Sequence, residues 1–251
     1  MSIVNSSGIT AYEHLHQRKR TWTPVQMTPG PLKAGGEDVV LRSLALRQLE
    51  IPVGDFVGEA SKGDLPSGSS SVGLLPLLAS NVADELKHDQ ALDYAAIAHK
   101  VPERYDAEAA LITKSWLELD RHPILKALII ERSVFFVLLP IFRALGDAGL
   151  RTTSQDISRD EVTHTATNAL VCQELNLKSD SKLNELRRAT VAWATQSPDP
   201  QATDKHLSRE HWMKASDQLY FTGKAQGLVE TRASRMPAFF EIDNQNLPQY
   251  A

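Results

Sequence analysis

Two carboxylate–imidazole pairs of equal spacing are the residues in this sequence best suited to chemistry. Glu85 precedes His88 by three positions, and Glu161 precedes His164 by three positions. Because residues i and i+3 share one face of a helix, each pair can bind a single ion. Both pairs lie in segments with the apolar periodicity of buried helices, where an ionised glutamate needs a positive partner such as a metal.

A third glutamate, Glu131, interrupts the apolar run Leu125–Leu145, one helix hairpin before Glu161. Two helices that each supply Glu-x-x-His and two more that each supply a carboxylate form the di-metal carboxylate site of a four-helix bundle. The alternative is that Glu131 pairs with a buried arginine such as Arg159, while the histidines satisfy hydrogen bonds in the core. A further Glu-x-x-His, from Glu13 to His16, lies in a polar segment and is interpreted as an exposed face.

Composition excludes several classes of protein. The chain has 251 residues, 42% of them hydrophobic, which is enough for one sizeable core. A net charge of −4 without a basic block does not favour nucleic acid or a membrane surface as partner. The only cysteine, Cys172, excludes a disulfide framework and a cysteine-based zinc site, and is interpreted as a buried structural thiol. The charges within Leu125–Leu145 favour a buried helix over a membrane span, and no secretory signal is visible, so we expect a cytoplasmic protein.

The pattern along the chain predicts an all-α fold without strands. We expect an N-terminal arm over residues 1–36, a helical domain over 37–236 and a C-terminal tail over 237–251. Pro52 and Gly54 are expected to interrupt the first helix, and residues 100–122 to form a polar, weakly helical connection. The main helices are expected near residues 37–50, 74–99, 123–145, 153–175, 181–195 and 207–230.

These residues resemble the radical-generating small subunit of class I ribonucleotide reductase, over most of the chain. The stretch from Asp160 to His164 is similar to the family's fourth metal-ligand helix, and Glu85 with His88 to its second. Glu131 followed by Phe135 resembles the third, in which an aromatic residue lines the pocket beside the metals. The resemblance implies a ferritin-like helical bundle with a dinuclear metal centre in its core.

The resemblance also implies a carboxylate ligand from the first helix. Glu59, followed by a short turn into a loop, resembles that residue, and Asp55 and Glu50 are rivals. The expected metal ligands are therefore Glu59, Glu85, His88, Glu131, Glu161 and His164. Oxygen and imidazole donors suit iron or manganese.

Three residues are expected to carry electrons. The segment Thr21–Pro24 resembles the one that places a tryptophan near the metals in this family. The resemblance implies that Trp22, Asp160 and His88 form a hydrogen-bonded electron route. By composition alone, Trp22 would be an ordinary anchor for the arm.

One departure from the family is important. Most members have a tyrosine four residues after the first ligand histidine, where they store a radical, and this chain has Leu92 there. Tyr94 is expected to face away from the metals. The departure favours members that store the oxidising equivalent on a manganese/iron pair, with Fe/Fe or Mn/Mn as other possibilities, or else a different reaction.

The resemblance implies an oxidoreductase subunit that is inactive without a large catalytic subunit, and a homodimer. Tyr250, near the end of the chain, is expected to be a relay residue, a docking anchor or neither. The competing hypotheses are a ferritin-like di-metal oxidase or monooxygenase acting on a small apolar substrate, and a bundle for metal storage or structure only.

Overall fold

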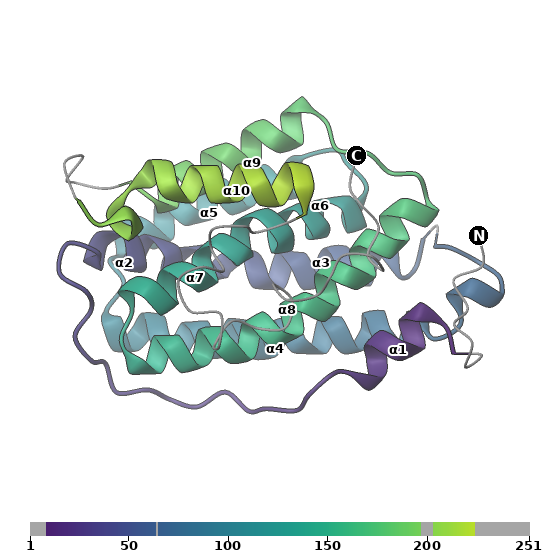
Figure 1. The fold of residues 1–251 in the computed structure, drawn as a ribbon, viewed down its shortest axis with the longest axis horizontal. Helices are drawn as coiled ribbons and strands as arrows, with labels where there is room; N and C mark the ends of the chain where they lie inside the picture. Colours follow the sequence, from purple (N-terminus) through teal and green to yellow (C-terminus); the bar gives the residue numbers. More distant parts are fainter. Residues whose placement is uncertain (1–8, 64, 197–202, 224–251) are drawn as a thin grey trace.

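The computed structural model describes residues 9–63, 65–196 and 203–223. Over these ranges the chain is helical and contains no strand, which confirms the all-α prediction (Figure 1). The predicted tail over residues 237–251, with Tyr250, lies outside the described residues. No helix in the described ranges has the length and apolar content needed to cross a membrane.

The central helices of the bundle are α3, α4, α6 and α8, which pack on one another and are extended by α7. Figure 1 shows α4 and α8 side by side, with α9 and α10 stacked along the opposite side of the molecule. The α-helices are α1 (Ala11–Gln17), α2 (Glu37–Ala45), α3 (Glu50–Ala60), α4 (Leu74–His99), α5 (Glu103–Glu118), α6 (Pro123–Ile130), α7 (Phe136–Leu145), α8 (Ala148–Glu174), α9 (Ser181–Ala194) and α10 (Arg209–Thr222).

Pro52 and Gly54 do not interrupt α3, contrary to the prediction. A 3₁₀ turn, η1 (Leu46–Leu49), joins α2 to α3, and Pro52 lies in the first turn of α3. A proline is tolerated there because the amides of the first turn have no partner within the helix. Gly54 lies where α3 approaches α4, since a Cβ at this position would be 3.3 Å from the Cβ of Glu85. The glycine therefore lets the two helices approach closely beside a predicted metal ligand.

The apolar run Leu125–Leu145 is divided into α6, a π-helical turn called η3 (Glu131–Phe135), and α7. Its charged side chains have partners in the surrounding helices. The Lys126 ammonium lies 3.4 Å from the carbonyl of Trp116 at the end of α5, and the Arg132 guanidinium donates to the carbonyl of Leu219 at 2.8 Å. The run is thus a buried core element, as predicted.

Residues 103–118 form a regular helix, α5, where the sequence indicated only a weakly helical connection. The helix buries Tyr105, Ala109, Thr113 and Trp116, which share one face. The indole of Trp116 is fully buried and donates to the Thr190 hydroxyl at 3.0 Å. The polar outer face of α5 hid this narrow apolar stripe from the sequence reasoning.

The N-terminal arm lies along one side of the bundle. Its first described helix is α1, whose capping box joins Thr10 and Glu13. Residues 18–36 then form no helix and run along the lower edge of the molecule in Figure 1 to reach α2. The amide of Gly30 donates to the Asp147 carboxylate at 2.6 Å, which attaches the arm to the start of α8.

We predict that the contact of Gly54 with α4 contributes to stability. Gly54→Val should lower the free energy of unfolding by about 1–3 kcal/mol, because the added methyl groups would push Glu85 and α4 away. The matched control is Gly58→Val in the same helix, where a Cβ would meet nothing within 4 Å. Urea unfolding of both variants in EDTA measures the difference. Equal stability of the two variants would contradict the prediction.

Candidate metal centre

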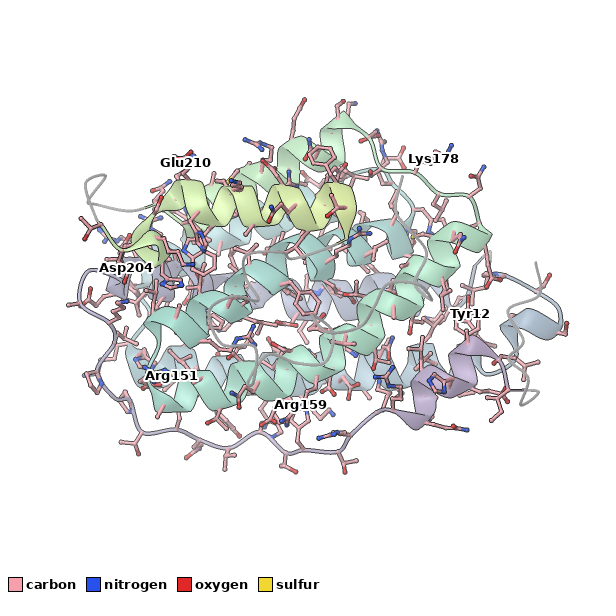
Figure 2. The ribbon with its side chains drawn as sticks, in the orientation of Figure 1. Tyr12, Arg151, Arg159, Lys178, Asp204 and Glu210 are labelled. Carbon is pink, nitrogen blue, oxygen red and sulfur yellow. The ribbon has the colours of Figure 1, made fainter. Side chains whose placement is uncertain are left out.

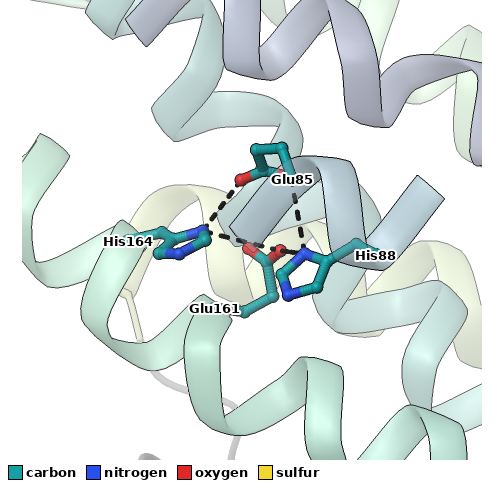
Figure 3. Close-up of side chains that lie close together, drawn as sticks. All are labelled: Glu85, His88, Glu161 and His164. Carbon is teal, nitrogen blue, oxygen red and sulfur yellow. Dashed lines mark ion pairs between the residues drawn. The ribbon is translucent and has the colours of Figure 1, made fainter. Parts of the chain in front are cut away.

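Four predicted ligands converge between α4 and α8. One ligand atom from each of Glu85, His88, Glu161 and His164 lies within 4.8 Å of the other three, and all four residues are buried (Figure 3). The Nδ1 atom of His88 is 3.2 Å from Oε1 of Glu161, and the Nδ1 atom of His164 is 2.8 Å from Oε1 of Glu85. The two imidazole rings stack with their centroids 5.6 Å apart. The i, i+3 spacing therefore brings both pairs to one point, as predicted.

Two further carboxylates adjoin this group. Oε2 of Glu50, at the start of α3, lies 3.6 Å from Nδ1 of His88. Glu131, in the π-helical turn, is fully buried and accepts a hydrogen bond of 2.8 Å from Asn168 through Oε2. Burial, together with the charges of Glu161 and Glu85, raises the pKa of the Glu131 carboxyl well above the usual range. We define the ligand cluster as Glu50, Glu85, His88, Glu131, Glu161 and His164.

The choice of Glu59 as the first-helix ligand is corrected by the structure. Glu59 and its rival Asp55 are exposed, and Glu59 is near the ammonium of Lys126. Glu50, the other rival, is buried and faces the histidines. Helical periodicity in the sequence already predicts that Glu50 is buried, since it shares a face with the buried Val53 and Val57.

Most polar atoms of the ligand cluster that face one another lack a hydrogen bond. Within the described part of the chain, these atoms make ion-pair contacts with one another at most and no hydrogen bond: Oε2 of Glu50, both carboxylate oxygens of Glu85 and of Glu161, Oε1 of Glu131, and Nδ1 of His88 and of His164. Most buried polar atoms in proteins are hydrogen-bonded, so a concentration of exceptions at one point requires an explanation such as an ion. These atoms are carboxylate oxygens and imidazole nitrogens, the donors that iron and manganese take in proteins. The residues therefore fit a metal centre.

The charges of the ligand cluster also favour a metal centre. Among described residues, His88 and His164 are the basic groups within ion-pair distance of Glu50, Glu85 and Glu161, and none lies within that distance of Glu131. Burial and neighbouring carboxylates raise the pKa of Glu50 and of Glu161. Burial opposes protonation of His164, but Glu85 and Asp84 outweigh it and raise its pKa to about 10. Without a metal, the cluster therefore retains protons to offset its negative charge.

The alternative pairing of Glu131 with Arg159 is wrong. Arg159 lies on the outer side of α8, where its guanidinium donates to Asp156 at 3.0 Å (Figure 2). The side chain is 49% exposed and does not reach the buried Glu131.

The Nε2 atom of each ligand histidine contacts an aspartate of the other helix, on the side of the ring away from the cluster. Nε2 of His88 on α4 lies 3.2 Å from Asp160 on α8, and Nε2 of His164 on α8 lies 3.2 Å from Asp84 on α4. Asp84 was not predicted from the sequence to have a role. The signal was available, because Asp84 precedes Glu85 as Asp160 precedes Glu161. The reciprocal contacts leave both Nδ1 atoms free to face the carboxylates.

Trp22 makes the contact that was expected of it. Its indole nitrogen donates to Asp160 at 2.6 Å, and its ring stacks on His88 with centroids 6.1 Å apart. Trp22 is half-buried, so the trio of Trp22, Asp160 and His88 leads from the ligand cluster toward the surface. The ammonium of Lys87 lies 5.5 Å from the centre of the indole ring.

The remaining candidate residues are Leu92, Phe135, Tyr94 and Tyr250. Leu92, one turn after His88, and Phe135 are both buried in the core. The Tyr94 hydroxyl accepts a hydrogen bond of 3.0 Å from Gln90 on the exposed side of α4, in agreement with the expectation that it faces outward. Tyr250 lies outside the described residues.

The chain matches no protein-family model, no curated protein and no solved structure.

The protons held by the ligand cluster predict a pH dependence of stability. The carboxyl groups of Glu50, Glu131 and Glu161 and the imidazoles of His88 and His164 have raised pKa values, so these five groups bind more protons in the folded, metal-free chain than in the unfolded chain. Stability must then fall as pH rises. In EDTA, we expect the Tm to drop by at least about 5 °C between pH 6 and pH 9.

Divalent metal should reduce this drop, because the ions take the place of the protons. Scanning calorimetry with EDTA and with Mn²⁺ at each pH checks both statements. A Tm that rises with pH in EDTA, or falls equally with and without Mn²⁺, would contradict them. The depressed pKa values of Asp84 and Glu85 act only below about pH 4, outside this window.

Proposed function

We propose that the ligand cluster holds two redox-active metal ions in a ferritin-like bundle, and that the chain is the small subunit of a class I ribonucleotide reductase. The observation that carries the metal centre is the set of buried carboxylate and imidazole atoms without hydrogen bonds. Two divalent ions would balance its four carboxylates and leave both imidazoles neutral, the form in which histidine binds metal. Manganese with iron is the favoured pair, because Leu92 leaves no tyrosine at the family's usual radical position.

The bound ions would supply an oxidising equivalent, and the protein would protect and direct it. Leu92 and Phe135 contribute apolar surface to the buried surroundings of the ligands. Such surroundings exclude water from the centre. Asp160 accepts hydrogen bonds from both Trp22 and His88, which provides a continuous path for an electron between the half-buried indole and a metal-binding imidazole.

The substrate chemistry would take place on a separate large subunit. The chain has one cysteine, Cys172, and this side chain is buried. The proposed electron path ends at Trp22, so we expect the large subunit to dock near this residue. A homodimer of the small subunit remains part of the proposal.

A second candidate function is a di-metal oxidase or monooxygenase that acts on a small apolar substrate. Leu92 favours it, since a leucine beside the metals offers apolar surface and no oxidisable group. This candidate requires activity without a partner protein and has no need for the path through Trp22.

We predict that Glu50, and not Glu59, is required for the full metal content. Glu50→Ala should lower the content by at least one ion per chain, because it removes a carboxylate that faces His88. Glu59→Ala removes an exposed carboxylate from the same helix and should keep the wild-type content. Elemental analysis of both variants, loaded with Mn²⁺ and Fe²⁺ under the same conditions, decides the matter. Equal loss in both variants would refute the assignment.

The reductase function is tested by mixing the metal-loaded chain with candidate large subunits and assaying nucleotide reduction. Trp22→Phe should keep the metals and lose at least about a hundredfold in activity, because the indole N–H and its oxidisable ring are both removed. A control is Trp193→Phe, since this half-buried indole donates to Glu108, away from the ligand cluster. If the isolated chain turned over a small apolar substrate, and Trp22→Phe did so at the wild-type rate, the monooxygenase function would be supported instead.

A further inference from the structure

The two halves of the ligand cluster are similar in geometry but differ in the charge behind each histidine. Asp84, behind His164, forms ion pairs with two ammonium groups, those of Lys19 and Lys87, and the Lys87 contact is 2.5 Å. Asp160, behind His88, accepts from the neutral indole of Trp22, and its nearest ammonium, that of Lys87, is 3.9 Å away.

This difference in charge should change how strongly the Nδ1 atom of each histidine binds a metal. A carboxylate that accepts the N–H of an imidazole makes the other ring nitrogen a stronger ligand. Ammonium groups in contact with that carboxylate offset its negative charge and weaken the effect. Asp160 should therefore strengthen His88 more than Asp84 strengthens His164, although both hydrogen bonds are 3.2 Å long.

Lys19 is the component of this arrangement that the central helices do not supply. It lies in the arm, just after α1, and its side chain is only 10% exposed. Its ammonium also donates to the Asn81 side chain on α4 at 2.8 Å. Burial lowers the pKa of Lys19, and the Asp84 carboxylate opposes that shift. A buried ammonium so close to a metal ligand raises the local potential, which disfavours a cation.

We infer that Lys19 makes the two metal positions unequal: it is a positioning and specificity-determining residue that weakens ion binding beside His164 relative to binding beside His88. The arm therefore contributes to both halves of the centre, through Trp22 to one and Lys19 to the other. An unequal pair of positions is what a protein needs in order to bind two different metals in a fixed order. This inference rests on the proposed dinuclear centre.

The arm contains a second lysine that distinguishes this role from simple attachment. Lys33 forms an ion pair with Asp204, before the 3₁₀ turn η4 (Lys205–Leu207), so it also joins the arm to the helical body. Its side chain is 42% exposed, and neither partner belongs to the ligand cluster or to the aspartates behind it. Loss of either lysine removes contacts between the arm and the helical body, but only the loss of Lys19 should affect the metals.

The test is the stepwise binding of Co²⁺ to the metal-free chain, measured anaerobically by calorimetry and visible absorption. Lys19→Met should tighten one of the two binding steps by about tenfold and leave the other within about twofold. Lys33→Met should match wild type in both binding steps. Lys19→Arg, which keeps the positive charge, should keep the wild-type difference between the two Co²⁺ affinities. Asp84→Asn should weaken the step that Lys19→Met tightens, by about tenfold or more, and it leaves the arm lysine in place.

Proton NMR of the Co²⁺-loaded chain supplies a readout that mere loosening of the arm would not produce. The shifted N–H resonance of His164 should move in Lys19→Met, while that of His88 stays in place. Equal changes in both steps, an unchanged isotherm in Lys19→Met, or the same effect in Lys33→Met would overturn the inference. Absence of Co²⁺ binding by the wild-type chain would overturn the proposed metal centre itself, which separates the two failures.

Discussion

The structure depends on one electrostatic constraint, the burial of four carboxylates around two imidazoles. Glu50, Glu85, Glu131 and Glu161 are each at most 2% exposed, and their basic neighbours in the described chain are the two ligand histidines. Burial of an unpaired carboxylate costs several kcal/mol, so four of them at one point would oppose folding unless protons or metal ions balance their charge. A functional role explains why helices would retain such an arrangement.

The helices meet this constraint through reciprocal contacts. Because α4 and α8 run antiparallel beside each other, Asp84 reaches His164 and Asp160 reaches His88, so each helix orients a ligand of the other. The arm completes the arrangement from outside, since its Lys19 and Trp22 contact the two aspartates. Rigid helices fix the ligands, and the arm places an indole and an ammonium group against the aspartates behind them.

Much of this site could be predicted from the sequence, because its main signals are local. The spacing of Glu85 with His88 and of Glu161 with His164 follows from helix geometry, and Glu131 is evident as a charge within an apolar run. The choice between Glu50 and Glu59 failed because resemblance and chain spacing were preferred to the apolar face that Glu50 shares with Val53. The narrow buried face of α5 was missed among polar residues. The contact of Lys19 with Asp84 had no local signal, because it depends on how an irregular arm crosses the bundle.

The ligand cluster is proposed to bind a pair of metal ions. Anomalous diffraction from crystals of the metal-loaded chain, recorded at the manganese and iron absorption edges, tests it directly. Two peaks about 3.5–4 Å apart, each beside Nδ1 of one ligand histidine, would support a dinuclear centre. A cluster without anomalous density, with its carboxylates hydrogen-bonded to water alone, would contradict it.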